Sequence, residues 1–411
     1  MCLNWNMQEF ELKNKIKAVY KRNKNTPRVG LSINFSINEP EKVPGTYCTM
    51  SRLLLQGTKV RNAEQLANEL EKNAIELCCD MKQDYLRFRI VCLNEDIEKA
   101  VQIISDIIKN STFVEFEKEK IKMKGEIIAE LDSARVKTLD NYYKTLFQGH
   151  FYGHTYTKML ENLDKIKKGD VVKAYNSLVK TSLKVISFIG DIEYSEAKNL
   201  LNNYLGDIEN SNPTARNIPI PYLDEAEVSE IIKNDAQQAQ IIQGWIFPNF
   251  KSEDYPAIVL LNVILGSSGL SSRLFIELRE KKGLAYHVRS NYETNEKCAN
   301  FSLYIATEPK NIQICLDGFR TEIQKLKDIP VSQQELKNAV NNIIGKHQFL
   351  TETNAQQANQ LAYYGILEVG FDFQEKIIKK LKKVTPKQVQ DCANKYFSEN
   401  FVVSILRPEL N

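Results

Sequence analysis

The sequence predicts an α+β protein with two similar domains, each a mostly antiparallel sheet packed by helices. Three observations support this fold class. Segments with strand-like alternation are interleaved with segments of helical periodicity, the order of these segments in the first half returns in the second, and a proline-containing stretch separates the halves. The length of 411 residues also exceeds the usual size of one compact core.

The first half opens with an alternating strand at 28–37 and a helix over about 44–56 that stops at Gly57. Asn62 then caps a helix predicted over 63–77, where apolar residues recur at helical spacing. The elements that complete this half are a strand at 84–93, helices at about 96–109 and 113–131, and a strand at 183–188. The stretch 117–124 mixes both signs of charge, which predicts a solvated helix face.

The second half repeats this order. A strand is predicted at 238–247, and the helix that follows over 255–266 closes on Gly266. The remaining elements are a helix at 272–283, strands at 285–293 and 299–307, and helices at 311–326 and 332–349. Similar strands beginning near Phe88 and Phe301 lie about half the chain apart, which favours two similar domains over a single larger one.

The joint between the halves is visible in the composition. The stretch 206–227 carries three prolines and no helical period, as expected for a linker. We therefore expect an N-terminal domain over 1–208, a linker over 209–227 and a C-terminal domain over 228–411.

Charge and hydropathy exclude several classes of partner. The 55 basic and 52 acidic residues give a net charge of only +3, so there is no electrostatic case for nucleic acid or an anionic membrane. No apolar run reaches the ~18 residues of a membrane span, and the first residues lack the apolar core of a signal peptide. The eight cysteines show no metal-like spacing, and we expect reduced thiols in a cytoplasmic protein.

The segment PGTYCTMSRLLLQGT, residues 44–58, resembles the metal helix of the pitrilysin/insulinase zinc peptidases, or inverzincins. In that family the helix carries H-x-x-E-H, two zinc-ligating histidines with a glutamate base between them. The resemblance places Cys48 and Arg52 at the histidine positions and Ser51 at the base position. The family's third ligand, a glutamate, falls on Ala129, with Glu130 beside it as an alternative.

These replacements remove the chemistry of a catalytic zinc site. Such a site needs about three protein ligands and an open position for water. A guanidinium such as that of Arg52 cannot coordinate zinc, and a lone thiol at Cys48 does not make a site. We therefore expect that this chain binds no metal and does not hydrolyse peptides by itself.

His150 and His154 are four residues apart, which is a ligand spacing on a helix. Gly149 and Gly153 interrupt any helix there, so the two rings need not share a face. The segment resembles a family loop of the form H-P-Y-G, with Phe151 in place of the proline. We expect a structural loop rather than a metal site.

The segment SSRLFIELREKKGLAYHV, residues 271–288, closely resembles the family's second-domain signature. It contains Arg279 and Tyr286, which correspond to the arginine and tyrosine that family members bring to the zinc from the opposite half. A phenol and a guanidinium can donate to the oxyanion of a tetrahedral intermediate. Taken singly, these residues would also be explained as a solvated helix charge and an ordinary strand residue.

The resemblance implies an assembly of two subunits, each with two homologous α+β domains, that close as a clamshell around a chamber for unfolded peptides. Our leading hypothesis is the non-metal subunit of a heterodimeric peptidase. A homologous partner with H-x-x-E-H would bind the zinc, while this chain supplies half of the chamber together with Arg279 and Tyr286. The alternatives are an inert peptide-binding or scaffold protein of the same fold and, more remotely, a self-sufficient enzyme with another metal. Cys78 and Cys79 stand where active members carry an Asn-Ala pair on a substrate-pairing edge strand.

Overall fold

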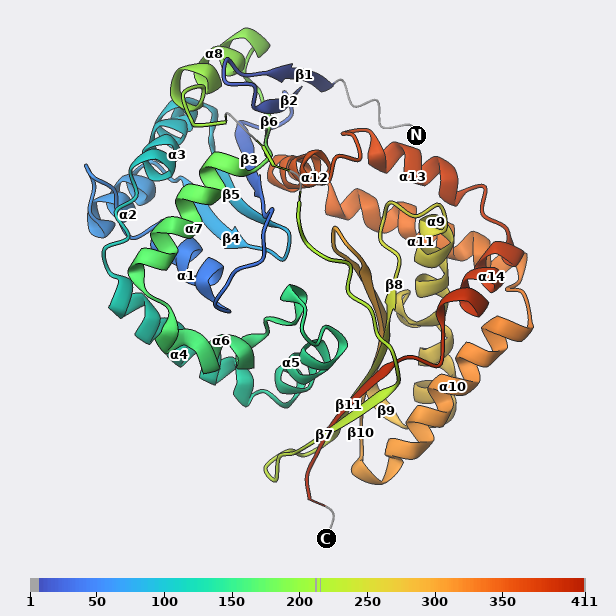
Figure 1. Cartoon of the computed structure of the whole chain (residues 1–411). Helices are drawn as coiled ribbons and strands as arrows, with labels where there is room; N and C mark the ends of the chain where they lie inside the picture. Colours follow the sequence, from blue (N-terminus) through green and yellow to red (C-terminus); the bar gives the residue numbers. More distant parts are fainter. Residues whose placement is uncertain (1–6, 211–212, 215, 410–411) are drawn as a thin grey trace. The chain divides into compact units, whose positions relative to one another are not determined.

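The computed structural model describes residues 7–210, 213–214 and 216–409 and contains two sheets packed by helices (Figure 1). Cys2 and part of the expected linker, residues 211–212 and 215, lie outside the described residues. The other seven cysteines are free thiols. Within the described part of the chain, no helix is both long and apolar enough to cross a bilayer.

The first sheet has six strands in the order β1-β2-β6-β3-β5-β4. β2 and β6 run parallel, and all other neighbours are antiparallel. The strands are β1 Met7–Glu11, β2 Lys17–Arg22, β3 Arg28–Ser36, β4 Glu76–Met81, β5 Tyr85–Leu93 and β6 Lys184–Gly190.

The second sheet has five strands in the order β7-β11-β8-β10-β9. Its strands are β7 Glu227–Ile232, β8 Ala239–Phe247, β9 Ala285–Thr294, β10 Ala299–Thr307 and β11 Val402–Arg407. One parallel pair, β7 with β11, is followed by three antiparallel pairs, which is the pattern of β2-β6-β3-β5-β4 in the first sheet. The predicted α+β fold with two similar, mostly antiparallel sheets is confirmed.

The helices follow in chain order. Up to the second sheet they are α1 Thr46–Leu53, α2 Ala63–Lys72, α3 Ile97–Asn110, α4 Phe116–Asp132, α5 Ala134–Leu146, α6 Tyr156–Asn162, α7 Lys168–Thr181 and α8 Tyr194–Leu205. After β8 they are α9 Tyr255–Asn262, the π-helices η4 Val263–Ser267 and η5 Phe275–Lys281, α10 Ile312–Asp328, α11 Gln333–Leu350, α12 Asn354–Ile366, α13 Phe373–Leu381 and α14 Pro386–Tyr396. Short 3₁₀ turns are η1 Asn94–Asp96, η2 Phe151–Gly153, η3 Leu163–Lys165 and η6 Pro309–Asn311.

Each sheet is covered by a helix from the other half of the sequence. α12 packs on β3 and β6 of the first sheet, and α5 packs on β8 and β11 of the second (Figure 1). The contact of α5 is close: a Cβ on Gly244 of β8 would lie 2.0 Å from the Tyr142 hydroxyl oxygen, so only glycine fits there. Buried on both faces, β6 is apolar almost throughout, whereas β5 alternates buried and half-exposed residues.

The chain accordingly forms two compact units, each assembled from three stretches. The first unit comprises Met1–Gly125, Glu161–Ile218 and Gln348–Phe373, and the second comprises Glu126–Leu160, Pro219–His347 and Gln374–Asn411. All described strands of the first sheet lie in the first unit and those of the second sheet in the second unit. The domain boundaries expected from the sequence, 1–208 and 228–411, remain a prediction.

The structure corrects two local expectations. The helix predicted over 63–77 ends at Lys72, and β4 begins at Glu76, because pairing with β5 overrides the helical pattern. Ala74, between them, has φ of 47°, outside the right-handed helical region. The charged stretch 117–124 is also not a fully solvated face, since Glu119 and Lys120 are buried.

Candidate functional site

The helix that resembles the family's metal helix, α1, begins at a buried carboxylate. Glu41 Oε1 accepts from the backbone N–H of Gly45 and Oε2 from that of Tyr47, each at 2.8 Å. A negative charge at this end is favourable, because the first N–H groups of a helix are unpaired and its dipole is positive there. This cap positions Cys48, Ser51 and Arg52 along α1.

Cys48 and Ser51 do not supply the ligands and base of a zinc site. Burial, with the nearby Glu41 carboxylate, raises the pKa of the Cys48 thiol to about 12, although Arg52 opposes this shift. The thiol is therefore protonated at neutral pH, and a single thiol does not make a three-ligand site. The Ser51 hydroxyl is buried and donates to the Cys48 carbonyl oxygen at 2.9 Å, so it cannot take the place of a carboxylate base.

Arg52 has an ionic partner on α4. Its Nε lies 3.3 Å from Oε2 of Glu119, whose side chain is only 5% exposed. The guanidinium thus occupies a histidine position with its charge directed at a buried carboxylate. This pair is one of the contacts between α1 and α4.

The residues at these positions do not fit a zinc ion. A guanidinium, a protonated thiol and a hydroxyl bonded within its own helix offer no set of three donors. Ala129 and Glu130, expected near a third ligand, are both exposed on α4. Among residues 7–210, 213–214 and 216–409, no group of three or more His, Cys, Asp or Glu side chains is arranged to hold a metal.

The histidine pair lies in a loop of the second unit. His150 Nδ1 accepts from the N–H of Tyr152 at 3.0 Å, so Nε2 carries the proton and donates to the Pro219 carbonyl oxygen at 2.9 Å. Burial lowers the pKa of His150, which keeps the ring neutral. Both ring nitrogens are engaged in holding the loop, as expected for a structural role.

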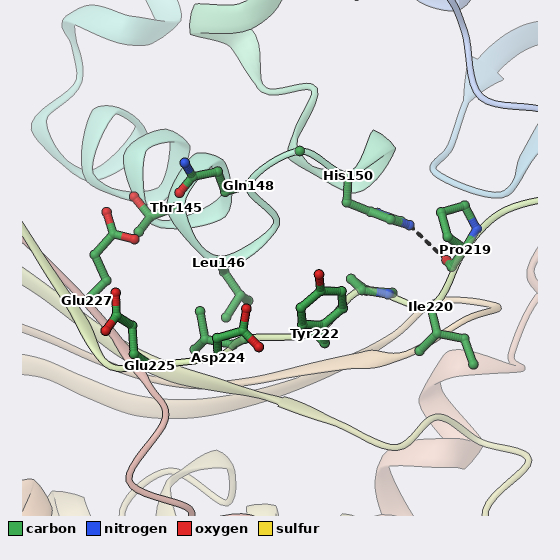
Figure 2. A pocket seen from close by; sticks show the side chains of 13 residues that line it. Thr145, Leu146, Gln148, His150, Pro219, Ile220, Tyr222, Asp224, Glu225 and Glu227 are labelled. Atoms are coloured by element: carbon green, nitrogen blue, oxygen red, sulfur yellow. Dashed lines mark hydrogen bonds between the residues drawn. The ribbon is translucent and has the colours of Figure 1, made fainter.

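Beside this loop lies a hollow of about 440 Å³ between the end of α5 and the segment 219–227. Figure 2 shows the carboxylates of Asp224, Glu225 and Glu227 on its wall and the bond from His150 to Pro219. None of the lining residues is a lysine or an arginine. The hollow is therefore acidic, but the ring of His150 is not free within it.

Arg279 and Tyr286 are brought together by the π-helix η5 and the start of β9. Arg279 Nη1 donates to the Tyr286 carbonyl oxygen at 2.7 Å. The guanidinium carbon also lies 4.8 Å from the centroid of the Tyr286 ring and 4.7 Å from that of Phe275. Two aromatic rings and one carbonyl thus fix a guanidinium that has no carboxylate partner among the described residues.

A β-bulge directs Tyr286 outward. β9 pairs with β10 so that His287 faces Ala306 while Ala285 faces Thr307, and Tyr286 has no opposite residue. Tyr286 and His287 are consequently both exposed, although regular alternation would turn one of them inward. Tyr286 is 79% exposed. The phenol is therefore exposed to solvent.

Gly283 ends η5 and makes the turn into β9. Its φ is +61°, in the left-handed region, and its N–H donates to the Arg279 carbonyl oxygen at 3.0 Å. Such a C-terminal cap strongly favours glycine. The GLAY portion of the signature thus sets the geometry of the Arg279–Tyr286 pair.

In the first unit, β4 is an edge strand that carries Cys78 and Cys79. Cys78 Sγ accepts from Arg89 Nη2 at 3.3 Å, and burial raises the pKa of the Cys79 thiol. β4 occupies in its sheet the place that β9 occupies in the second sheet. The two edge strands β4 and β9 are therefore equivalent positions in the two repeated sheets.

Two sequence models of one family match the chain. Residues 15–158 match the model described as insulinase, peptidase family M16, and residues 165–343 match the model described as peptidase M16 inactive domain. The chain belongs to peptidase family M16. The predicted family is therefore confirmed, and the Arg279–Tyr286 segment of this M16 chain lies within the match to the inactive domain.

Curated relatives share nearly the whole length of this M16 chain. It is 23% identical over 411 residues to the uncharacterized zinc protease YmxG of Bacillus subtilis, covering 98% of this chain and 99% of that protein. It is 24% identical over 399 residues to the non-peptidase homolog YmxG of Helicobacter pylori, covering 92% and 88%.

Solved structures share the fold. The peptidase M16 inactive domain from Pseudomonas fluorescens matches with a TM-score of 0.89 at 20% identity, covering 98% of this chain and 99% of that one. A protease from Helicobacter pylori also matches with a TM-score of 0.89, at 19% identity and the same coverage. At these identities the likeness establishes the fold alone.

Two features of this M16 chain were not anticipated from sequence. Glu119, the partner of Arg52, is hidden within a run of alternating charges, and only its burial distinguishes it. A cluster of basic residues around Tyr304 joins α5 to the β9–β10 hairpin, which is distant from it in sequence, so no local pattern could have revealed it.

Proposed function

We propose that this chain is the non-metal half of a paired M16 peptidase. A homologous partner with an intact H-x-x-E-H helix supplies the zinc and the base, and this chain supplies half of the peptide chamber together with Arg279 and Tyr286. The free thiols of the described cysteines accord with a cytoplasmic location.

The observation that carries the proposal is the contrast between the two sites. On α1, Arg52 is paired with Glu119 and no donor set for zinc remains. At the start of β9, by contrast, the Tyr286 phenol is exposed to solvent. A β-bulge, the glycine cap at Gly283 and the hydrogen bond from Arg279 hold it there. An exposed tyrosine adds little to the stability of the fold. A chain that had lost all function would therefore have no reason to keep this arrangement.

In the paired enzyme the two groups would act on developing negative charge. The carbonyl oxygen of the scissile peptide becomes an oxyanion when water attacks, and donors already in place stabilise it without reorganisation. The Tyr286 hydroxyl can donate directly. Arg279 holds the bulge through the Tyr286 carbonyl and adds a positive charge beside the phenol.

The decisive experiment is co-expression with a homologous chain that carries H-x-x-E-H. Cleavage of an unfolded peptide is measured with each chain alone and with both together, and zinc is quantified in each preparation. We expect cleavage by the pair only, with zinc in the partner. Stoichiometric zinc or cleavage with this chain alone would refute the proposal, as would a mixture no faster than the partner by itself.

A second candidate is an inert peptide-binding or scaffold protein. The specific observation in its favour is β4, an edge strand to which an extended peptide can add by backbone hydrogen bonds. The two candidates differ in one result. If the double variant Arg279→Ala with Tyr286→Phe leaves turnover of the assembled pair unchanged, the scaffold function is the correct one.

A further inference from the structure

A cluster of basic residues surrounds one tyrosine on the second sheet. Tyr304 of β10 stands opposite Arg289 of the edge strand β9. The Arg289 guanidinium carbon lies 5.9 Å from the centroid of the Tyr304 ring, and that of Arg135, in the first turn of α5, lies 5.4 Å from it. Two guanidiniums from two elements therefore share one aromatic ring.

Neither guanidinium is neutralised by the protein. Among the described residues, no carboxylate lies within ion-pair distance of Arg135 or Arg289. Burial and the charge of Arg135 both lower the pKa of Arg289. Two like charges are thus held together at a cost, and an anion between them would relieve that cost.

The N-terminal end of α5 adds to the positive potential, and the cluster is accessible to solvent. His287 packs edge-on against Tyr304, with ring centroids 5.4 Å apart, and burial together with Arg289, Arg135 and Arg279 lowers its pKa. Arg135, His287 and Arg289 are all exposed. Arg135 also lies at the N-terminal end of α5, where the helix dipole favours an anion.

Tyr304 fixes the centre of the cluster. Its hydroxyl donates to Oε1 of the buried Gln240 at 2.6 Å, which holds the ring in place beside both guanidiniums. A planar guanidinium stacked on a ring keeps its N–H donors directed sideways, the geometry that suits two-point binding of a carboxylate.

We propose that Arg135 and Arg289 bind a carboxylate of an extended peptide, either an acidic side chain or the C-terminal group. That the ligand is a peptide rests on the proposed function. The site lies on the same strand as Tyr286, so a peptide held there is anchored beside the groups that would meet the partner's zinc. Acidic peptides are thereby the preferred substrate class.

The test is a binding measurement on the full chain alone, without partner or zinc. The probe is a short fluorescein-labelled peptide of alternating Ser and Glu with a free C-terminus, followed by fluorescence anisotropy. Two matched peptides separate the carboxylates: one replaces every Glu by Gln, and the other has an amidated C-terminus. We expect the wild type to prefer the carboxylate form about tenfold or more, as for hydrogen bonds to charged groups.

Arg135→Gln and Arg289→Gln should each abolish this preference, and two variants on different elements guard against a folding defect in one. The matched control is Arg320→Gln, an exposed arginine on α10 of the same unit paired with Asp317, which should keep the preference. Equal affinity of the wild type for all three peptides, undetectable binding of every peptide, or a preference that survives both substitutions would overturn the proposal. So would tighter binding of a single-stranded oligonucleotide that is lost in the same variants.

This result is independent of catalysis. If the preference for the carboxylate peptide depends on Arg135 and Arg289 but the chain does not activate a zinc-bearing partner, the carboxylate site is supported and the paired-peptidase function is refuted. If the chain activates the partner but shows no such preference, the carboxylate site is refuted and the paired-peptidase function is supported.

Discussion

The guanidinium of Arg279 donates to the main-chain carbonyl oxygen of Tyr286 at 2.7 Å while stacking on the same residue's ring. The arginine therefore holds both the backbone and the ring of the tyrosine, and it leaves the phenol oxygen unoccupied. This relationship makes the contribution of the hydroxyl separable from that of the scaffold beneath it.

Tyr286→Phe removes only the phenol oxygen, because the contacts of Arg279 are to the ring and the carbonyl. We expect kcat of the assembled peptidase to fall about 10- to 1,000-fold, as for the loss of an oxyanion donor, with KM little changed. Steady-state kinetics of peptide cleavage by the pair measure this.

The control is Arg320→Ala, a surface arginine outside the site, which should have full activity. Arg279→Lys keeps the charge but loses the planar donors and the stacking, so its kcat should fall as well. Wild-type kcat in Tyr286→Phe would exclude a catalytic role for the phenol.

Arg52→Met should destabilise the chain, because it leaves the Glu119 carboxylate buried without its guanidinium. Breaking a buried pair is costly, and since Arg52 is 27% exposed we expect about 1–3 kcal/mol. Urea denaturation at constant m value measures the loss. The double variant Arg52→Met with Glu119→Gln should recover most of it, and equal stability of single and double variants would contradict the pairing.

Gly283→Ala should cost about 1–2 kcal/mol, because alanine at φ of +61° is strained even though its Cβ would meet no atom within 4 Å. The same substitution should lower turnover of the pair by displacing Arg279 and Tyr286. Gly125→Ala is the matched control: its Cβ also meets nothing, but it lies within α4, where alanine should stabilise by about 0.5–1 kcal/mol. Thermal unfolding compares the two, and effects of the same sign would be inconsistent with this account.

Lys184 on β6 gives a pH dependence of stability. Burial lowers its pKa from 10.5 to about 8, while its ammonium donates to the Ser182 carbonyl oxygen at 3.1 Å. Between these two pH values the unfolded chain binds more protons than the folded chain, so this residue makes the free energy of unfolding rise with pH. The penalty is fully present below about pH 8.

The comparison is with Lys184→Met: between pH 8 and 10 the free energy of unfolding of the wild type should rise relative to that of the variant. Buried thiols and tyrosines with a raised pKa, such as Cys92 and Tyr142, act in the opposite direction at alkaline pH and are common to both proteins. Urea titrations at several pH values measure the difference. Parallel curves for the two chains would show that Lys184 titrates normally.

Local sequence patterns predicted those strands and helices that have a clear periodicity or a capping residue of their own. β5 alternates apolar and polar residues, and α2 begins at a capping box of Asn62 and Gln65, so both were recognised. The end of α2 and the start of β4 were misplaced, because the choice between helix and strand there depends on hydrogen bonds to β5. The bulge at Tyr286 likewise arises from pairing with β10.

By itself the sequence determined the family and the two-sheet α+β fold, because both follow from residue types at fixed spacing. Tertiary structure alone decided that Glu119 neutralises Arg52, that α5 and α12 cover the sheets of the opposite halves, and that Arg135 and Arg289 share Tyr304. The physical reason is the distance along the chain over which each interaction acts. Periodicity and capping act within a few residues, whereas charge pairing and burial depend on which distant segments the fold brings into contact.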